Sequence, residues 1–189
     1  NHYSCIYETW RGGYHYSYMT VNDMNGDGYN YDAIYVPTDA EVESGAFRFV
    51  SQDDQDRFMG FLHNNKSLSK YQGKYAEGYS VYNPWVHRVD FSYKHDFKLN
   101  IGSTKHTLQL GIDIKNLLNL FNSSWGVSKT LNSAIGEDAR ILKYEGVDAQ
   151  GVATFSTPSA INADTKLFTP LHALGQCWNM GITVKYIFN

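Results

Sequence analysis

The last part of the chain alternates strictly between large apolar residues and small or polar ones. From residue 178 onward every second side chain is apolar: Trp178, Met180, Ile182, Val184, Tyr186 and Phe188. A period of two places these side chains on one face of a β-strand, whereas a helix would repeat every three or four residues. A length of about ten residues with aromatic side chains at both ends suits a tilted strand that crosses a bilayer. The pattern therefore predicts a membrane-crossing strand over residues 177–188.

Three earlier segments alternate in the same way. Residues 106–116 carry aliphatic side chains on one face and polar ones on the other, and residues 85–99 repeat this division. A face with several charged side chains is costly to bury, so it must meet water. Residues 3–19 alternate less clearly, because the phase of the pattern shifts at Gly12 and Gly13. A glycine pair at such a shift indicates a bulge or a bend.

The connections between the four segments differ in length. A short polar turn joins the middle two, while residues 20–84 and 117–176 form long connections. Short turns on one side and long loops on the other are typical of outer-membrane barrels. We therefore expect an all-β fold, in which these antiparallel strands are the last four of a large transmembrane β-barrel. The two long segments are then external loops.

Neither long segment has the composition of a simple linker. Residues 51–62 form an acidic stretch that is compatible with a helix. Residues 141–144 and 151–155 are short apolar runs that flank a Gly146-to-Gly151 turn, which predicts a hairpin.

Composition argues against a nucleic-acid-binding protein and against a transmembrane helix, and it is compatible with a membrane barrel. The net charge is −3, and no basic stripe is present, so we expect no nucleic-acid partner. Mean hydropathy is −0.44, and no apolar run is long enough for a transmembrane helix. The sequence has 15 tyrosines, 10 phenylalanines and 4 tryptophans, which fits interfacial aromatic belts or long external loops.

The ends of the chain and its cysteines add two expectations. The N-terminus has no initiator methionine and no signal-peptide pattern, so we expect the chain to be a portion of a longer protein. Cys5 and Cys177 are the only cysteines. The predicted strand order separates them beyond the reach of a disulfide, so we expect both to be unpaired.

One polar segment resembles the first half of a calcium-binding loop. It contains D-x-N-x-D-G, in which the oxygens of Asp23, Asn25 and Asp27 would surround the ion. The twelfth position, where a bidentate carboxylate is expected, is Ile34, and Asp32 comes two residues early. Two interpretations remain open: a calcium site, and an acidic turn capped by Asn and Asp side chains, which the sequence favours.

Catalytic chemistry finds no support in the sequence. The seven histidines are scattered without the spacing of a metal-binding pair. The strand carboxylates Asp90, Asp96 and Asp113 have basic neighbours, and ion pairs facing a barrel lumen explain them better than an acid/base pair. We therefore expect a protein that is not an enzyme.

Several longer motifs resemble the C-terminal end of a TonB-dependent outer-membrane receptor. Within that family the similarity is to the Bacteroidetes type that carries a carboxypeptidase-regulatory-like domain. The segments that carry the resemblance extend over nearly the whole chain: residues 23–28, 34–37, 71–76, 83–90, 110–122 and 122–127. The most specific are the strand that begins at Trp85, the D-x-x-N-L-L-N stretch at 113–119 and the aromatic terminus. One departure is the final residue, which is Asn189 where the family has an aromatic residue.

The resemblance implies a function and a set of partners. The family forms a 22-stranded barrel that holds a plug and imports a scarce ligand across the outer membrane with energy from the TonB complex. The partners would be outer-membrane lipid, the remaining strands and plug, the TonB complex, and a surface lipoprotein over the loops. Loop aromatics would contact the ligand, and the candidates are Tyr29, Tyr31, Tyr35, Tyr79, Tyr82 and Trp125.

A second hypothesis is a secreted, soluble β-rich module that binds a glycan or a protein and is stabilised by calcium. In a soluble sandwich the apolar side chains of residues 177–188 would be buried against another sheet. In a barrel they would form an outward belt, while Asn179, Thr183 and Lys185 would face the lumen.

Overall fold

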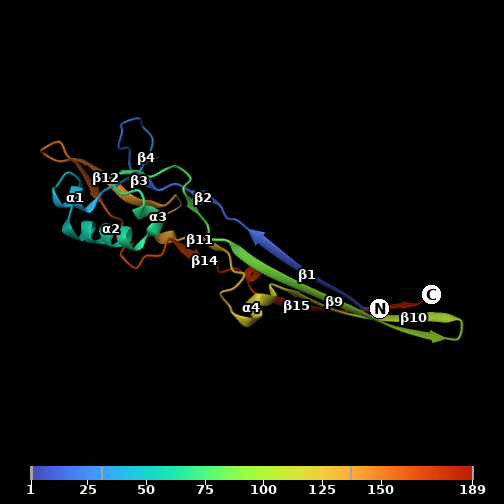
Figure 1. Cartoon of the computed structure of the whole chain (residues 1–189). Helices are drawn as coiled ribbons and strands as arrows, with labels where there is room; N and C mark the ends of the chain where they lie inside the picture. The colour runs from blue at the N-terminus through green and yellow to red at the C-terminus, as the bar shows by residue number, and fades with distance from the viewer. Residues whose placement is uncertain (1, 31, 137, 189) are drawn as a thin grey trace. The chain divides into compact units, whose positions relative to one another are not determined.

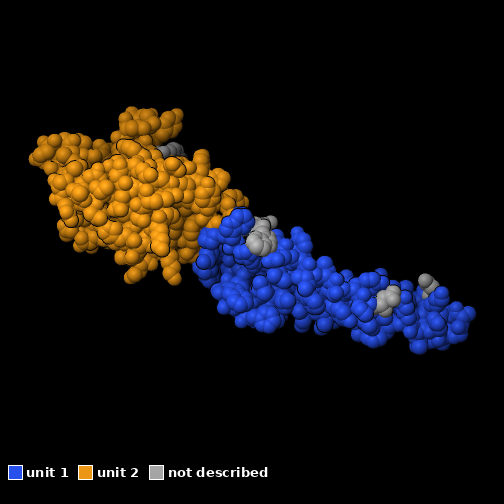
Figure 2. Space-filling model, in the orientation of Figure 1, with its two compact units in different colours: residues 1–12, 84–129, 170–189 blue, residues 13–83, 130–169 orange. Residues whose placement is uncertain are grey.

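The computed structural model describes residues 2–30, 32–136 and 138–188. The chain forms two compact units, coloured separately in Figure 2. Unit 1 consists of residues 1–12, 84–129 and 170–189, and unit 2 of residues 13–83 and 130–169. Each unit is therefore built from segments that are far apart in the sequence.

The expectation of a β protein is confirmed in its coarse form. Strands make up 43% of the chain and helices 18%, and the strands belong to several separate sheets. None of the helices in the described ranges is long and apolar enough to span a membrane.

Unit 1 is a four-stranded antiparallel sheet (Figure 1). Its strands are β1 (His2–Arg11), β9 (Val86–Ile101), β10 (Thr104–Lys115) and β15 (Asn179–Phe188), in the order β1-β9-β10-β15. The turn between β9 and β10 contains Gly102, whose φ of +63° suits a residue without a Cβ. Two short helical turns complete the unit, α4 (Leu117–Phe121) and η2 (Leu174–Gln176).

The bounds of β9, β10 and β15 lie within two residues of the predicted ranges, whereas the first strand differs. Where the sequence predicted one strand over residues 3–19, the structure has β1, then β2 (His15–Tyr16), then β3 (Met19–Val21). The interruption falls at the glycine pair. A Cβ on Gly13 would lie 2.0 Å from the Cβ of Asn83, so only glycine fits there.

Unit 2 contains most of the two segments that were predicted as external loops, and both are largely folded; residues 117–129 and 170–176 of the second segment belong to unit 1. Its main sheet is mixed, in the order β4-β3-β12-β13-β6. The other strands of this sheet are β4 (Asp32–Ala33), β6 (Arg48–Phe49), β12 (Arg140–Val147) and β13 (Ala153–Ser156). Three two-stranded sheets pair β2 with β8 (Val81–Tyr82), β5 (Tyr35–Val36) with β7 (Lys74–Tyr75), and β11 (Lys129–Leu131) with β14 (Phe168–Pro170). The helical elements are α1 (Asp39–Glu43), α2 (Gln52–Asn64), α3 (Lys66–Ser69) and η1 (Ser133–Ile135).

The helix and the hairpin that the sequence indicated inside these segments are both present. The helix is α2, and the hairpin is the antiparallel pair β12 and β13. Parallel strand pairs join the two segments: β3 runs beside β12, where Met19 lies opposite Arg140, and β6 runs beside β13, where Phe49 lies opposite Phe155. The two predicted loops therefore form one folded unit together.

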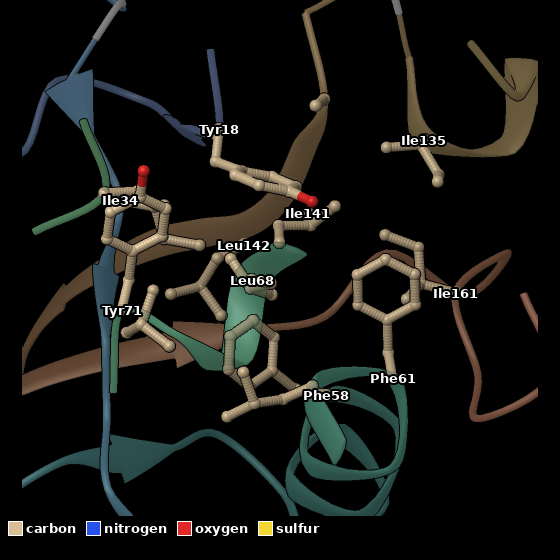
Figure 3. Packing of buried hydrophobic residues seen from close by; sticks show 14 of the residues in the cluster. Tyr18, Ile34, Phe58, Phe61, Leu68, Tyr71, Ile135, Ile141, Leu142 and Ile161 are labelled. Atoms are coloured by element: carbon tan, nitrogen blue, oxygen red, sulfur yellow. The ribbon is translucent and has the colours of Figure 1, made fainter. Parts of the chain in front are cut away.

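The α2 helix supplies much of the core of unit 2 (Figure 3). Phe58, Phe61 and Leu62 follow helical spacing and are 0–1% exposed. At the other end, the side chain of Ser51 caps the helix by accepting from the Asp54 amide. Burial acts to raise the pKa of Asp54, but hydrogen bonds from Ser51, Thr157 and Arg57 outweigh it and hold this pKa below its usual value.

The hydrophobic interior of the described chain lies entirely in unit 2. Each of the buried apolar residues belongs to residues 13–83 or 130–169. In unit 1 the buried positions among the described residues are two glycines and two asparagines: Gly111, Gly126, Asn116 and Asn119. Unit 1 is thus a sheet without a hydrophobic core.

Candidate functional site

The sheet of unit 1 has one apolar face, and that face is exposed. Residues that lie opposite each other in an antiparallel sheet share a face, so the register defines its members. Leu108, for example, lies between Phe97 and Tyr186. On β1 this face also carries the polar residues Ser4 and Glu8. Its exposed apolar side chains are Ile6, Tyr93, Phe97, Leu99, Ile101, Leu108, Leu110, Ile112, Met180, Ile182, Val184, Tyr186 and Phe188. We call this set the apolar face.

The opposite face is predominantly polar and is linked by side-chain hydrogen bonds. Ser92 donates to Asp113 at 2.6 Å, and Gln109 donates to Asp96 at 2.7 Å. Both bonds join β9 to β10. The polar face also holds Lys94, Lys98, Lys115, Thr183 and Lys185, together with the less polar Tyr3, Tyr7 and Ile187.

The face that carries the apolar side chains also holds the histidines His2, His87, His95 and His106. The rings of His2 and His95 are nearly parallel, with centroids 6.1 Å apart, and His95 also meets Phe97 edge-on at 4.4 Å. His106 forms a hydrogen bond with the hydroxyl of Tyr186 and stacks on its ring. The imidazoles of His2, His95 and His106 are therefore packed among aromatic rings on this face.

The N-L-L-N stretch ties together the end of the sheet where β10 stops. Asn116 adopts a left-handed conformation with φ +53°, which asparagine tolerates better than most residues. Its backbone N–H donates to Asp90 at 2.7 Å, and its side chain donates to the carbonyl of Gln176 at 2.8 Å. Asn119 donates to the carbonyls of Ser123 and Trp125 and accepts from the N–H of Trp178. The two asparagines thus fix the chain before β15.

The residues Asp23 to Asp32 form a compact turn whose oxygens accept hydrogen bonds from within the turn. Asp23 accepts from the amides of Gly26 and Gly28 at 2.6 and 2.7 Å, and the Gly28 bond contributes most to lowering the pKa of Asp23. The side-chain amide of Asn25 donates to both Asp27 and Asp32. Among the described residues, no group of three or more acidic, histidine or cysteine side chains is placed to hold a metal ion.

The described aromatic residues that were predicted to contact a ligand differ in their surroundings. Tyr79 and Tyr82 flank the ring of His15, with centroids 5.2 and 6.3 Å away, and both are exposed. Tyr29 is exposed on the acidic turn. Tyr35 is instead held in place, because it donates to Glu41 at 2.5 Å and packs against Tyr75. Trp125 is exposed in unit 1, and Tyr31 lies outside the described residues.

Sequence reasoning did not single out Arg88 and Gln176 as partners. Arg88 donates to the carbonyl of Gly126 at 3.2 Å and to the side-chain oxygen of Gln176 at 3.1 Å. Gln176 precedes β15 in a segment without periodicity, so no local pattern could have related it to a residue on β9. Cys5 and Cys177 are free and exposed, as predicted.

Comparisons with known proteins do not assign the chain to a family. No protein-family model, no curated protein and no solved structure matches it.

Proposed function

We propose that the chain is the C-terminal portion of a TonB-dependent outer-membrane receptor of the Bacteroidetes type, which imports a scarce ligand. In this proposal the sheet of unit 1 forms the last four strands of a 22-stranded barrel. The observation that carries the proposal is that the described residues of unit 1 form a sheet with an exposed apolar face and include no buried apolar residue apart from glycine. The motifs at 83–90 and 113–119 add the resemblance on which the family assignment rests.

Burial energetics favour a lipid environment for this sheet. Burying a large apolar side chain contributes about 1.5–3 kcal/mol, and this term normally offsets the entropy lost on folding. Along β15 the exposed fractions of Met180, Ile182, Val184, Tyr186 and Phe188 lie between 53% and 70%. A soluble sandwich would cover these side chains with a second sheet. Lipid would cover them without one, while the polar face met a water-filled lumen.

The two edges of the sheet agree with a place inside a larger barrel. β1 and β15 are the outer strands, so each has one edge without a partner strand among the described residues. Open edges within lipid leave backbone groups unsatisfied, and each such group costs several kcal/mol. In our proposal β1 pairs with the preceding strand of the barrel and β15 pairs with the first strand, which closes the barrel.

Unit 2 then becomes an external domain rather than a pair of flexible loops. Its own hydrophobic core lets it fold as a domain outside the membrane. Its exposed aromatics, including Tyr79 and Tyr82, would be available to the imported ligand or to a surface lipoprotein. The plug and the contact with the TonB complex would come from other parts of the protein.

Site-specific labelling along β15 tests the proposal directly. Cys5 and Cys177 are first replaced by serine, and single cysteines at Ile182, Thr183 and Val184 are labelled with an environment-sensitive fluorophore. The chain is then refolded into phosphatidylcholine vesicles. We expect blue-shifted emission, quenched by lipid-bound quenchers, at positions 182 and 184, and water-like emission at position 183.

The same experiment can overturn the proposal. Equal emission at the three positions would mean that the two faces meet the same medium. Quenching by water-soluble iodide at position 184 but not at 183 would place the apolar face in water. Either result would remove the membrane assignment.

A further inference from the structure

A small polar cavity lies against the polar face of unit 1, near the start of β9. Its volume is about 210 Å³, and it is lined by Thr9, Val86, Arg88, Asp90, Ser128 and Gln176. Val86, Arg88 and Asp90 alternate along β9 and so share a face, to which Thr9 on β1 also belongs because it lies opposite Arg88. The cavity thus combines a strand face with the loop residue Ser128 and with Gln176, the last residue of η2.

The cavity brings together two opposite charges that do not neutralise each other. Arg88 and Asp90 are two residues apart on one strand, which separates their backbones by about 7 Å. Across the described residues, no ion pair joins them. The Nε atom of Arg88 is buried and has no hydrogen-bond partner among the described residues. The Arg88 side chain as a whole is half-buried and has partners at Nη2, so the cost of an unmade hydrogen bond falls on this one N–H, and an acceptor placed near it would be favoured.

The fold holds both charged groups in position but leaves some of their hydrogen-bonding atoms without a partner in the described part of the chain. Arg88 is fixed through Nη2, which donates to Gly126 and Gln176. Asp90 is fixed through Oδ1, which accepts the Asn116 amide. A guanidinium has five N–H donors and a carboxylate has two acceptor oxygens, so each group can still bind a ligand atom.

We propose that this cavity binds a free α-amino acid, with its carboxylate at Arg88 and its ammonium group at Asp90. The volume lies below the range of about 300–1,000 Å³ that suits drug-sized ligands, which points to a compact molecule. None of the described residues that line the cavity is aromatic, so they offer no stacking surface of the kind that sugars commonly use. A zwitterion instead supplies one partner for each fixed charge, and the hydroxyls of Thr9 and Ser128 can complete its hydrogen bonds.

This inference rests on the proposed function, because the cavity would lie on the path of a ligand only if the sheet is part of a barrel. The cavity lies on the polar face, which in the barrel would face the lumen through which a ligand passes. It deepens that function by naming the chemical class of ligand that the wall of the barrel would recognise.

Titration of the whole chain in detergent micelles with three related probes tests the inference. L-alanine carries both charges, N-acetyl-L-alanine lacks the ammonium group, and L-alanine methyl ester lacks the carboxylate. We expect L-alanine to bind at least tenfold more tightly than either analogue, measured by calorimetry.

An Asp90→Asn variant assigns the contact, because asparagine keeps an oxygen that can accept the Asn116 amide but loses the charge. We expect the affinity for L-alanine to fall at least tenfold, to the level of N-acetyl-L-alanine. The matched control is Asp113→Asn, which makes the same change on the same polar face, where Asp113 bonds to Ser92. That variant should bind L-alanine as the unmodified chain does.

Three outcomes would overturn the inference: no heat from L-alanine at tens of millimolar, equal binding of the three probes, or an equal loss in both variants. Its failure can be told apart from failure of the proposed function. If labels on β15 still alternate between lipid and water while L-alanine does not bind, only the amino-acid site is refuted. If the labels do not alternate, the membrane assignment fails regardless of the titration.

Discussion

Replacing Val184 by arginine should sharply weaken the association of the chain with lipid. Val184 is the central member of the five apolar side chains from Met180 to Phe188 on β15. Eight residue steps at ~3.4 Å span ~27 Å, and a strand tilt of ~40° reduces this to ~21 Å along the membrane normal, close to the apolar band of ~25 Å in outer-membrane barrels. The side chain of Val184 would therefore lie near the midplane of the bilayer.

The expected magnitude follows from this depth. An arginine at the midplane on the lipid face costs about 2–4 kcal/mol, which corresponds to a fall of about 30- to 700-fold in the partition coefficient. The assay dilutes the urea-unfolded chain into zwitterionic phosphatidylcholine vesicles and measures the fraction that floats with them. Uncharged lipid headgroups avoid any gain from attraction between arginine and an anionic surface.

Thr183→Arg is the matched control for this substitution. Threonine is close to valine in shape, Thr183 is the neighbouring residue on β15, and its side chain belongs to the polar face. The same charge at this position should therefore leave partitioning nearly unchanged. Equal partitioning of the two variants, or an unchanged partition coefficient for Val184→Arg, would refute the assignment of the apolar face to lipid.

Further predictions concern unit 2. Phe58→Ala should lower its free energy of unfolding by about 3–5 kcal/mol, measured by hydrogen exchange of core amides, because the substitution leaves a cavity in a closed core. Asp54→Ala should cost about 2–4 kcal/mol in the same measurement, since buried donors lose their acceptor. Folding lowers the pKa of Asp54, so the ionised carboxylate stabilises unit 2 fully above the ordinary aspartate pKa, and this stabilisation is lost as the pH falls through the lowered value. Asp54→Asn should therefore remove the part of the pH dependence of unfolding that this carboxylate causes. Asp23→Ala should accelerate hydrogen exchange at the amides of Gly26 and Gly28, and unchanged rates there would show that the turn does not depend on this carboxylate.

The sequence predicted the strands of unit 1 well because the pattern that defines them is local. β10 and β15 alternate over their whole lengths, and such alternation depends only on which face each side chain takes. The first strand was predicted too long because the close approach of Asn83 to Gly13 is a tertiary constraint. Nothing in the neighbouring residues reveals that contact.

The organisation of unit 2 could not be predicted for a related reason. Its main sheet depends on β3 pairing in parallel with β12, more than a hundred residues later in the chain. β3 has only three residues, which is too short a run for a pattern that could identify β12 as its partner. The sequence therefore identified α2 and the hairpin within their own segments, but it treated the two segments as separate loops.

The candidate site shows the same division between local and distant information. The spacing of Asp23, Asn25 and Asp27 indicated a polar turn, and the structure has one whose hydrogen bonds lie within a few residues. The cavity beside Arg88 depends on Gln176, which lies 88 positions away in the sequence. Sites assembled from separate strands and loops require the register of the sheet before their members can be recognised.

Hydrophobic residues in this chain lie in two different environments, a closed core and an exposed sheet face. The spacing of these residues along the chain differs between the two. In α2 the apolar residues repeat with helical spacing, and Phe58 and Leu62 are fully buried within unit 2. In β15 they repeat every second residue, and Ile182 and Val184 are exposed although they are equally apolar. A soluble protein rarely exposes a contiguous apolar surface that covers one face of a whole sheet. Unit 2 shows that this sequence can bury apolar side chains in an ordinary core. A general failure to form a core therefore does not explain the exposed face of unit 1. Its exposure is a property of that sheet, and the lipid environment that we propose would account for it.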